Sequence, residues 1–220
     1  MPRESKKLLR QRAQRIFETL LQEFPDATCE LTHSNALELL IATILSAQCT
    51  DVMVNRVTPA LFKKYPNAQD YAEANIEELE QYIRRIGLYR SKAKNIIKCC
   101  QALCANHNGE VPETIKQLTD LAGVGRKTAN VVLGNIFGIN EGVVVDTHVR
   151  RISQLLGIVV SNSPEKIEME LMNIFPRSDW TILSHLIILH GRKTCVARRP
   201  KCKNCRIIDD CRFAQRKKNI

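Results

Sequence analysis

A chain of 220 residues with 44% hydrophobic residues can bury one large or two small hydrophobic cores, which excludes a disordered polypeptide. The formal charge of +10 favours a polyanionic partner, with nucleic acid as the first candidate and an acidic membrane surface as the second. Aromatic residues make up only 5% of the chain, which argues against a base-stacking platform for single strands.

Secretion and membrane insertion are disfavoured as well. The stretch from Met1 to Arg15 is rich in Lys and Arg and lacks the continuous apolar segment of a signal peptide. The longest apolar runs, around Leu39–Leu45 and Ile182–Leu189, are too short to span a bilayer. We therefore expect a cytoplasmic protein with no membrane association, in which the nine cysteines do not form a disulfide framework.

Hydrophobic residues recur at helical spacing through the first half of the chain. Asn35 with Glu38, and Asn75 with Glu78, are pairs that favour helix starts, and Gly87 is expected to stop the helix before it. The predicted helices in this half cover residues 5–24, 36–48, 51–65, 76–86 and 90–106.

The second half continues the helical pattern. A short helix over 112–122 is followed at once by another that reaches residue 137. Asp146, Ser163 and Asp179 are expected to begin helices over 147–156, 164–174 and 180–190. No alternating run of strand length interrupts the pattern, so the sequence predicts an all-α fold of about ten short helices. The division between domains is expected between residues 134 and 142.

The segment Leu121-Ala-Gly-Val-Gly-Arg-Lys-Thr-Ala stops one helix and starts the next. Gly123 and Gly125 permit positive φ, and the tight corner leaves unpaired N–H groups at the start of the second helix. Such a positive helix end can hold a phosphate. An ordinary helix corner explains two glycines equally well, but the lysine two residues past the second glycine favours a DNA-binding helix–hairpin–helix element.

Lys127 and Asp146 are the candidates for covalent chemistry. A lysine amine beside a docked phosphate can attack the anomeric carbon of a sugar, expel the base and leave a Schiff base. Asp146 follows an extended run, Val143–Val145, and has the position of a helix cap. Near Lys127, its carboxylate would also accept a proton or stabilise a cationic sugar. The alternatives are a lysine that only pairs with phosphate and an aspartate that only caps a helix.

Four of the nine cysteines lie in one short stretch, with six, two and five residues between them: Cys195, Cys202, Cys205 and Cys211. Zinc sites commonly have two short cysteine knuckles joined by a longer arm, so this spacing favours a cubane iron–sulfur cluster, with zinc as the second interpretation. Arg198, Arg199 and Lys201 lie among the cysteines, where they offset thiolate charge and present cations to a phosphate backbone.

Taken together, the hairpin segment, Val144-Val-Asp-Thr-His148 and the four-cysteine tail resemble the endonuclease III family of the helix–hairpin–helix superfamily. Two further segments, Leu39–Asp51 and Ile86–Ala93, resemble it too, so the resemblance covers nearly the whole chain. Members of this family are bifunctional DNA glycosylases and AP lyases. The resemblance implies that Lys127 is the Schiff-base nucleophile, that Asp146 activates it, and that the four tail cysteines hold a [4Fe–4S] cluster.

The resemblance also implies contacts with double-stranded DNA that carries a damaged base or an abasic site. Gln48 and Leu88 match the positions that fill the gap and wedge the stack when a nucleotide is flipped out, a step required to reach the sugar. The implied DNA-binding residues are Gln48, Leu88, Gly123, Val124, Gly125, Arg126, Thr128, His148, Arg198, Arg199 and Lys201.

The family fold implies two helical domains that flank a DNA-binding cleft. A six-helix domain would span residues 30–135, with the hairpin at about 113–137, and an iron–sulfur domain would combine residues 1–29 with 136–220. We expect a monomer that associates with the nucleoid through DNA. The alternatives are a monofunctional adenine or mismatch glycosylase of the same superfamily, disfavoured by Lys127, and a non-catalytic zinc module, which has no use for Lys127 and Asp146 together.

Overall fold

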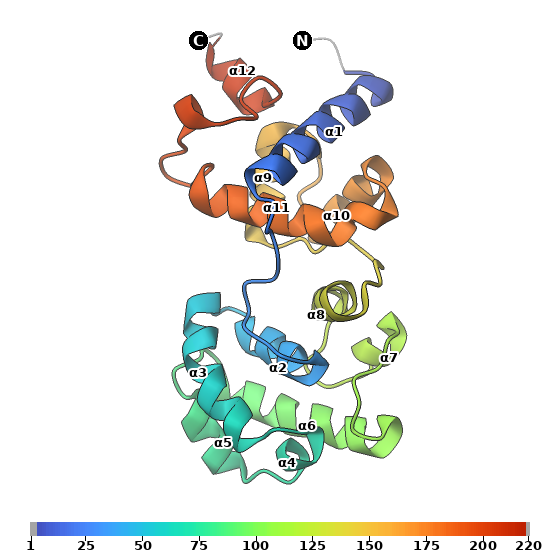
Figure 1. Ribbon diagram of the computed structural model, residues 1–220, viewed down its shortest axis with the longest axis vertical. Helices are drawn as coiled ribbons and strands as arrows, with labels where there is room; N and C mark the ends of the chain where they lie inside the picture. Colours follow the sequence, from blue (N-terminus) through green and yellow to red (C-terminus); the bar gives the residue numbers. More distant parts are fainter. Residues whose placement is uncertain (1–3, 219–220) are drawn as a thin grey trace. The chain divides into compact units, whose positions relative to one another are not determined.

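The computed structural model describes residues 4–218, with side chains to residue 216. Residues 1–3 and 219–220, which the sequence assigns to the domain formed by both chain ends, lie outside the described residues. The described residues form helices and no β-strand, which confirms the predicted all-α class (Figure 1). The first helices are α1 (Lys6–Glu23), α2 (Ala36–Ser46), α3 (Asp51–Lys64), α4 (Ala68–Ala72), α5 (Ile76–Ile83) and α6 (Tyr89–His107).

The remaining elements follow the centre of the chain. They are α7 (Ile115–Thr119), α8 (Arg126–Val132), the π-helical η1 (Leu133–Phe137), α9 (Thr147–Leu156), α10 (Pro164–Ile174), the 3₁₀ turn η2 (Arg177–Asp179), α11 (Trp180–Lys193), the 3₁₀ turn η3 (Cys202–Asn204) and α12 (Arg212–Lys218). None of the described helices combines the length and apolarity needed to cross a membrane.

Capping side chains explain why most helices begin where the sequence predicts. The side-chain oxygen of Asn35 accepts a hydrogen bond from the N–H of Glu38 at 2.9 Å. That of Asn75 accepts from the N–H groups of Glu77 at 2.9 Å and Glu78 at 3.0 Å. These contacts satisfy donors that the first helical turn leaves unpaired, and so they fix the starts of α2 and α5.

Several predicted helix boundaries are wrong. The α5 helix ends at Ile83 rather than residue 86, and Gly87 does not adopt the left-handed conformation of a helix stop. The α11 helix begins at Trp180, directly after Asp179 as predicted, but it ends at Lys193 rather than at residue 190. Asp179 makes no capping hydrogen bond there, and its carboxylate accepts from the Ser178 hydroxyl at 2.9 Å. The α4 helix was not predicted, since five residues are too few to show a period.

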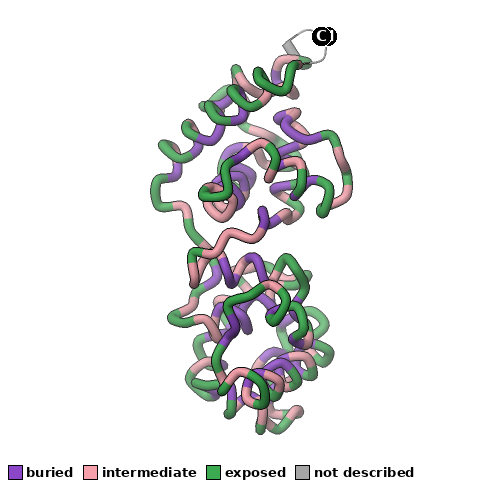
Figure 2. Tube along the Cα trace, turned by 90° about the vertical axis from the view of Figure 1, so that its right-hand side faces the viewer, coloured by how far each residue is buried: buried purple, intermediate pink, exposed green. Residues whose placement is uncertain are grey.

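The chain divides into two compact units. Unit 1 combines the chain ends, up to Thr28 and from Asn140 onward, and unit 2 spans Cys29–Ile139. The sequence-based boundary after residue 135 lies inside η1, which continues directly from α8 and keeps that segment in unit 2. Along the helices of both units, buried positions alternate with exposed ones, as expected for amphipathic helices (Figure 2).

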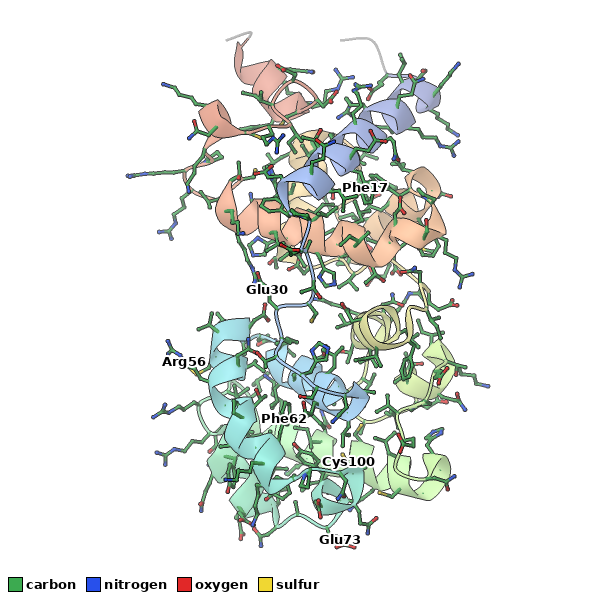
Figure 3. The ribbon with its side chains drawn as sticks, in the orientation of Figure 1. Phe17, Glu30, Arg56, Phe62, Glu73 and Cys100 are labelled. Carbon is green, nitrogen blue, oxygen red and sulfur yellow. The ribbon has the colours of Figure 1, made fainter. Side chains whose placement is uncertain are left out.

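Unit 2 is built around α2. Every residue from Leu39 to Leu45 is buried, and α3, α6 and α8 pack against this helix. The α6 helix also packs on α4 and α5 and contributes Cys99 and Cys100 to the core (Figure 3). A helix that is apolar nearly all round therefore lies in the middle of its domain, as the sequence predicts.

Unit 1 joins the N-terminal helix to the C-terminal third of the chain. The α1 helix packs on α11, and the rings of Phe17 and Phe175 lie 6.1 Å apart. Arg12 is buried on α1, and its guanidinium donates to the carbonyls of Leu156 at 2.8 Å and Asp210 at 2.8 Å. A buried charge that is fully hydrogen-bonded fixes α1 to the end of α9 and to the C-terminal segment.

Candidate functional site

The hairpin of unit 2 consists of α7, a glycine turn and α8. Gly123 has φ +79°, so it requires the left-handed conformation that glycine tolerates. Gly125 is the N-cap of α8 with φ −92°, and no side chain caps the helix there. Both glycines permit positive φ, but only Gly123 adopts it. A Cβ at Gly125 would meet nothing within 4 Å, so its space is open for a ligand.

The residues around this turn divide into a buried and an exposed set. Val124 lies in the core of unit 2, and its N–H donates to the carbonyl of Leu121 at 3.2 Å. Because the Val124 side chain faces the protein interior, a contact with DNA remains a prediction only for the backbone of this residue. Arg126 and Lys127 are exposed in the first turn of α8, and Thr128 is half-buried. The turn thus presents Lys127 to solvent at the start of a helix.

We expect the two glycines to respond differently to alanine. Gly123→Ala forces positive φ on a side chain and places its Cβ 2.9 Å from that of Asn95, so it should lower the free energy of unfolding by about 1–3 kcal/mol. Gly125→Ala should leave stability nearly unchanged and weaken binding to abasic-site DNA, because its Cβ enters the open space. Urea denaturation measures the free energy of unfolding, and fluorescence anisotropy measures the affinity for DNA. Equal losses of stability in the two variants would contradict the different backbone roles of Gly123 and Gly125.

Gln48 and Leu88 share an unusual backbone conformation. Gln48 follows α2 with φ 54°, and Leu88 precedes α6 with φ 58°. Both side chains are exposed, and Leu88 is 59% accessible despite being apolar. Left-handed conformations of bulky residues cost about 1–3 kcal/mol each and gather at functional sites. The two segments touch, because a Cβ placed at Gly87 would lie 3.5 Å from the carbonyl oxygen of Gln48.

Asp146 belongs to unit 1 and begins α9. Its Oδ1 accepts a hydrogen bond from the N–H of Val149 at 2.7 Å, which confirms the predicted N-cap. The preceding extended segment is anchored because the N–H of Val144 donates to the Ser184 hydroxyl at 3.1 Å. Asp146 remains half-buried, so the carboxylate is held at a fixed position and stays accessible.

His148 lies two residues further along α9. Its ring packs on α11 at Gly191, where a Cβ would come within 2.8 Å of the imidazole Nδ1. Among the described residues, this buried Nδ1 has no hydrogen-bond partner. A glycine at 191 therefore admits the ring, and His148 is half-buried rather than fully presented to solvent. Its predicted contact with DNA stays a prediction.

All four tail cysteines line one pocket of unit 1, together with apolar side chains of α9 and the C-terminal segment. In the described part of the chain, no three His, Cys, Asp or Glu side chains gather closely enough to hold a single metal ion. Four sulfurs around one largely apolar space nevertheless provide the donor set of an iron–sulfur cluster.

Two basic side chains lie beside the cysteine sulfurs. A guanidinium N–H of Arg151 points to Cys195 Sγ at 3.9 Å, and His190 Nε2 lies 4.0 Å from Cys205 Sγ. Burial raises the pKa of Cys205 to about 11, so the free thiol keeps its proton at neutral pH. Binding as thiolate therefore requires a metal to replace that proton. Arg198, Arg199 and Lys201 are exposed on the loop after Cys195.

Sequence reasoning missed one residue of unit 2, close to Gln48. Lys92 lies on α6 and is only 5% exposed, although lysine is rarely buried. The available signal was its place beside Ala93 and Ile96 on the apolar face of a predicted helix. A lysine in such a stripe indicates a buried partner, which only the folded chain identifies.

Comparison with known proteins decides the family. Residues 41–177 match the HhH-GPD superfamily of base excision DNA repair proteins. Over 206 residues the chain is 48% identical to endonuclease III of Synechocystis sp., covering 94% of each chain. It is 43% identical to endonuclease III of Escherichia coli K12 over 201 residues, covering 91% of this chain and 95% of the relative. The chain belongs to the endonuclease III family.

Solved structures of this family agree with the fold. One, described as a non-covalent endonuclease III–DNA complex, matches with a TM-score of 0.90 at 46% identity and covers 96% of this chain and 99% of that one. Another, described as a trapped endonuclease III–DNA covalent intermediate, matches with a TM-score of 0.89 at 47% identity, covering 95% and 98%. A thermostable thymine-DNA glycosylase shares the fold at 22% identity with a TM-score of 0.78, covering 94% and 98%.

Proposed function

We propose that this endonuclease III family member removes oxidised or otherwise damaged pyrimidines from duplex DNA and cleaves the strand at the resulting abasic site. The observation that carries the proposal is the exposed Lys127 in the first turn of α8, directly after the glycine turn. A non-catalytic DNA-binding hairpin needs phosphate contacts but no reactive amine at this position. We further propose that the protein acts as a monomer on DNA in the cytoplasm.

In the proposed reaction the neutral amine of Lys127 attacks C1′ of the damaged nucleotide. The C1′–N bond to the base breaks, and the base leaves with the bonding electrons and takes up a proton. Ring opening gives a Schiff base between C1′ and Nζ. Loss of a proton from C2′ then expels the 3′ phosphate by β-elimination, and water releases the lysine. Asp146 accepts the proton of the attacking amine and stabilises positive charge on the sugar.

Reaching C1′ requires that the nucleotide leave the base stack. Gln48 and Leu88 are proposed to fill the gap and separate the neighbouring bases, consistent with their exposure and left-handed backbones. The glycine turn, with Arg126 and Thr128, and the exposed Arg198, Arg199 and Lys201 are proposed to bind the phosphate backbone. These cations supply a salt-dependent affinity that does not depend on sequence.

We also propose that the four tail cysteines hold a [4Fe–4S] cluster. Bound there, the cluster supplies a structural crosslink that positions the basic loop for DNA. The purified protein should therefore be yellow-brown with about four iron atoms per chain. Cys202→Ser should lose colour and iron, whereas Cys104→Ser, at a half-buried cysteine of unit 2, should retain both. Colourless protein with stoichiometric zinc would instead favour the zinc module.

Cleavage of defined oligonucleotides tests the function. The substrates are duplexes with one oxidised pyrimidine, the same duplex with an abasic site, and an undamaged control. We expect base release and strand cleavage on the duplex with the oxidised pyrimidine, and strand cleavage alone on the duplex with the abasic site. A monofunctional glycosylase would release the base and leave the strand intact, and a binding module would leave all three unchanged.

A further inference from the structure

Lys92 makes an unusual contact at the end of a neighbouring helix. From α6, its ammonium donates to the backbone carbonyls of Leu45 at 2.9 Å and Ala47 at 2.6 Å. These carbonyls belong to the C-terminal end of α2, where helical oxygens lack partners within the helix and carry partial negative charge. A side chain of another helix thus caps α2 directly before Gln48.

Burying this ammonium opposes stability. Burial lowers the pKa of Lys92, and only the nearby Cys49 acts in the opposite direction. The other buried positions of α6 are occupied by alanine, isoleucine, leucine and cysteine, so a hydrophobic side chain would fill this one without the desolvation cost. The gain from lysine must therefore lie in the geometry that its hydrogen bonds impose.

The same residue also contacts the second left-handed segment. Its backbone N–H donates to the carbonyl of Leu88 at 3.1 Å, closing the first turn of α6. The Lys92 side chain therefore connects the residue before Gln48 to α6, and the backbone hydrogen bond, which does not depend on the side chain, holds Leu88 at the start of the same helix. Because Gly87 also approaches the Gln48 carbonyl, the two segments have little freedom to separate. Strained backbones persist only where the surroundings fix them in this way.

We propose that Lys92 is a positioning residue that holds Gln48 and Leu88 at a fixed spacing, so that both side chains enter the duplex together. This inference rests on the proposed function, in which these two residues replace the flipped nucleotide. Lys92 touches neither the substrate nor Lys127 in this role. It acts through the backbone of the two inserted segments.

The test compares Lys92→Met with Lys98→Met, which removes the same charge from an exposed position of the same helix. Single-turnover base excision from duplex DNA should fall on the order of 10-fold for Lys92→Met and stay unchanged for Lys98→Met, since small misplacements of positioning groups cost rate. Borohydride trapping on a single-stranded abasic site, which has no stack to open, should be nearly equal in both variants. The fluorescence of a 2-aminopurine placed opposite the abasic site should increase when Lys98→Met binds the duplex and should not increase when Lys92→Met binds it.

A second background separates positioning from general stability. In a chain that already carries Gln48→Ala and Leu88→Ala, adding Lys92→Met should cause no further loss of rate, because its targets are gone. The same loss in both backgrounds would overturn the proposal. If Lys92→Met does not fold, Lys92→Arg, which keeps the charge but changes the geometry of the hydrogen bonds, is measured in the same two backgrounds. A loss of rate in the unmodified background alone supports the proposal, and no loss, or the same loss in both backgrounds, overturns it. Absence of excision by the unmodified chain would instead reject the proposed function.

Discussion

Lys127→Ala is expected to abolish the covalent product that borohydride traps with abasic-site DNA. Borohydride reduces a Schiff base to a stable amine, so trapping requires an amine that reaches C1′. Lys127 is exposed in the first turn of α8, and alanine is tolerated well in a helix. DNA binding should therefore remain largely intact. Gel electrophoresis of the trapped complex and anisotropy with the same duplex measure the two properties.

The control for this prediction is Lys116→Ala. Lys116 is an exposed lysine of α7, so the change removes the same charge from the same hairpin without touching α8. It should trap at the normal rate. If Lys127→Ala also traps normally, another amine forms the Schiff base and the assigned nucleophile is wrong.

Asp146→Asn should separate capping from catalysis. Asparagine caps helices as well as aspartate, so the hydrogen bond to the Val149 N–H survives and the free energy of unfolding should change by less than about 0.5 kcal/mol. The amide cannot accept a proton or offset a cationic sugar. Single-turnover base excision should therefore fall by about 10²- to 10⁴-fold.

Asp146→Ala provides the comparison, since it removes both properties and should also cost about 1 kcal/mol of stability. For the unmodified chain and the two variants, urea denaturation gives the free energy of unfolding and rapid-quench kinetics give the rate of base excision. Full excision activity in the asparagine variant would show that Asp146 is a helix cap alone.

The sequence predicts the fold well where a local signal has one physical solution. Asn35, Asn75 and Asp146 begin helices at the predicted residues because each side chain satisfies N–H groups within three residues of itself. Helix ends are less predictable. The α5 helix ends at Ile83 rather than at the predicted residue 86. Gly87 lies close to the carbonyl oxygen of Gln48 instead, and this approach of two distant segments has no local sequence signal.

The candidate site shows the same contrast. Lys127 and Asp146 are predictable from sequence, because the chemistry of an amine and a carboxylate, combined with the motif spacing, indicates a role without knowledge of the fold. The left-handed backbone conformations of Gln48 and Leu88 have no sequence signal, because glutamine and leucine normally avoid that region of φ and ψ. The contacts of Lys92 are not predictable from sequence, because its acceptors are carbonyls, which every residue carries and which only the folded chain brings near α6.

The arrangement of unit 1 has a consequence for synthesis. The α1 helix is synthesised before unit 2, whereas the carbonyls of Leu156 and Asp210 that bind Arg12 are synthesised after it. Unit 2 is continuous and emerges whole in the meantime. The apolar face of α1 therefore lacks its partners in unit 1 until the segments that follow unit 2 have been synthesised.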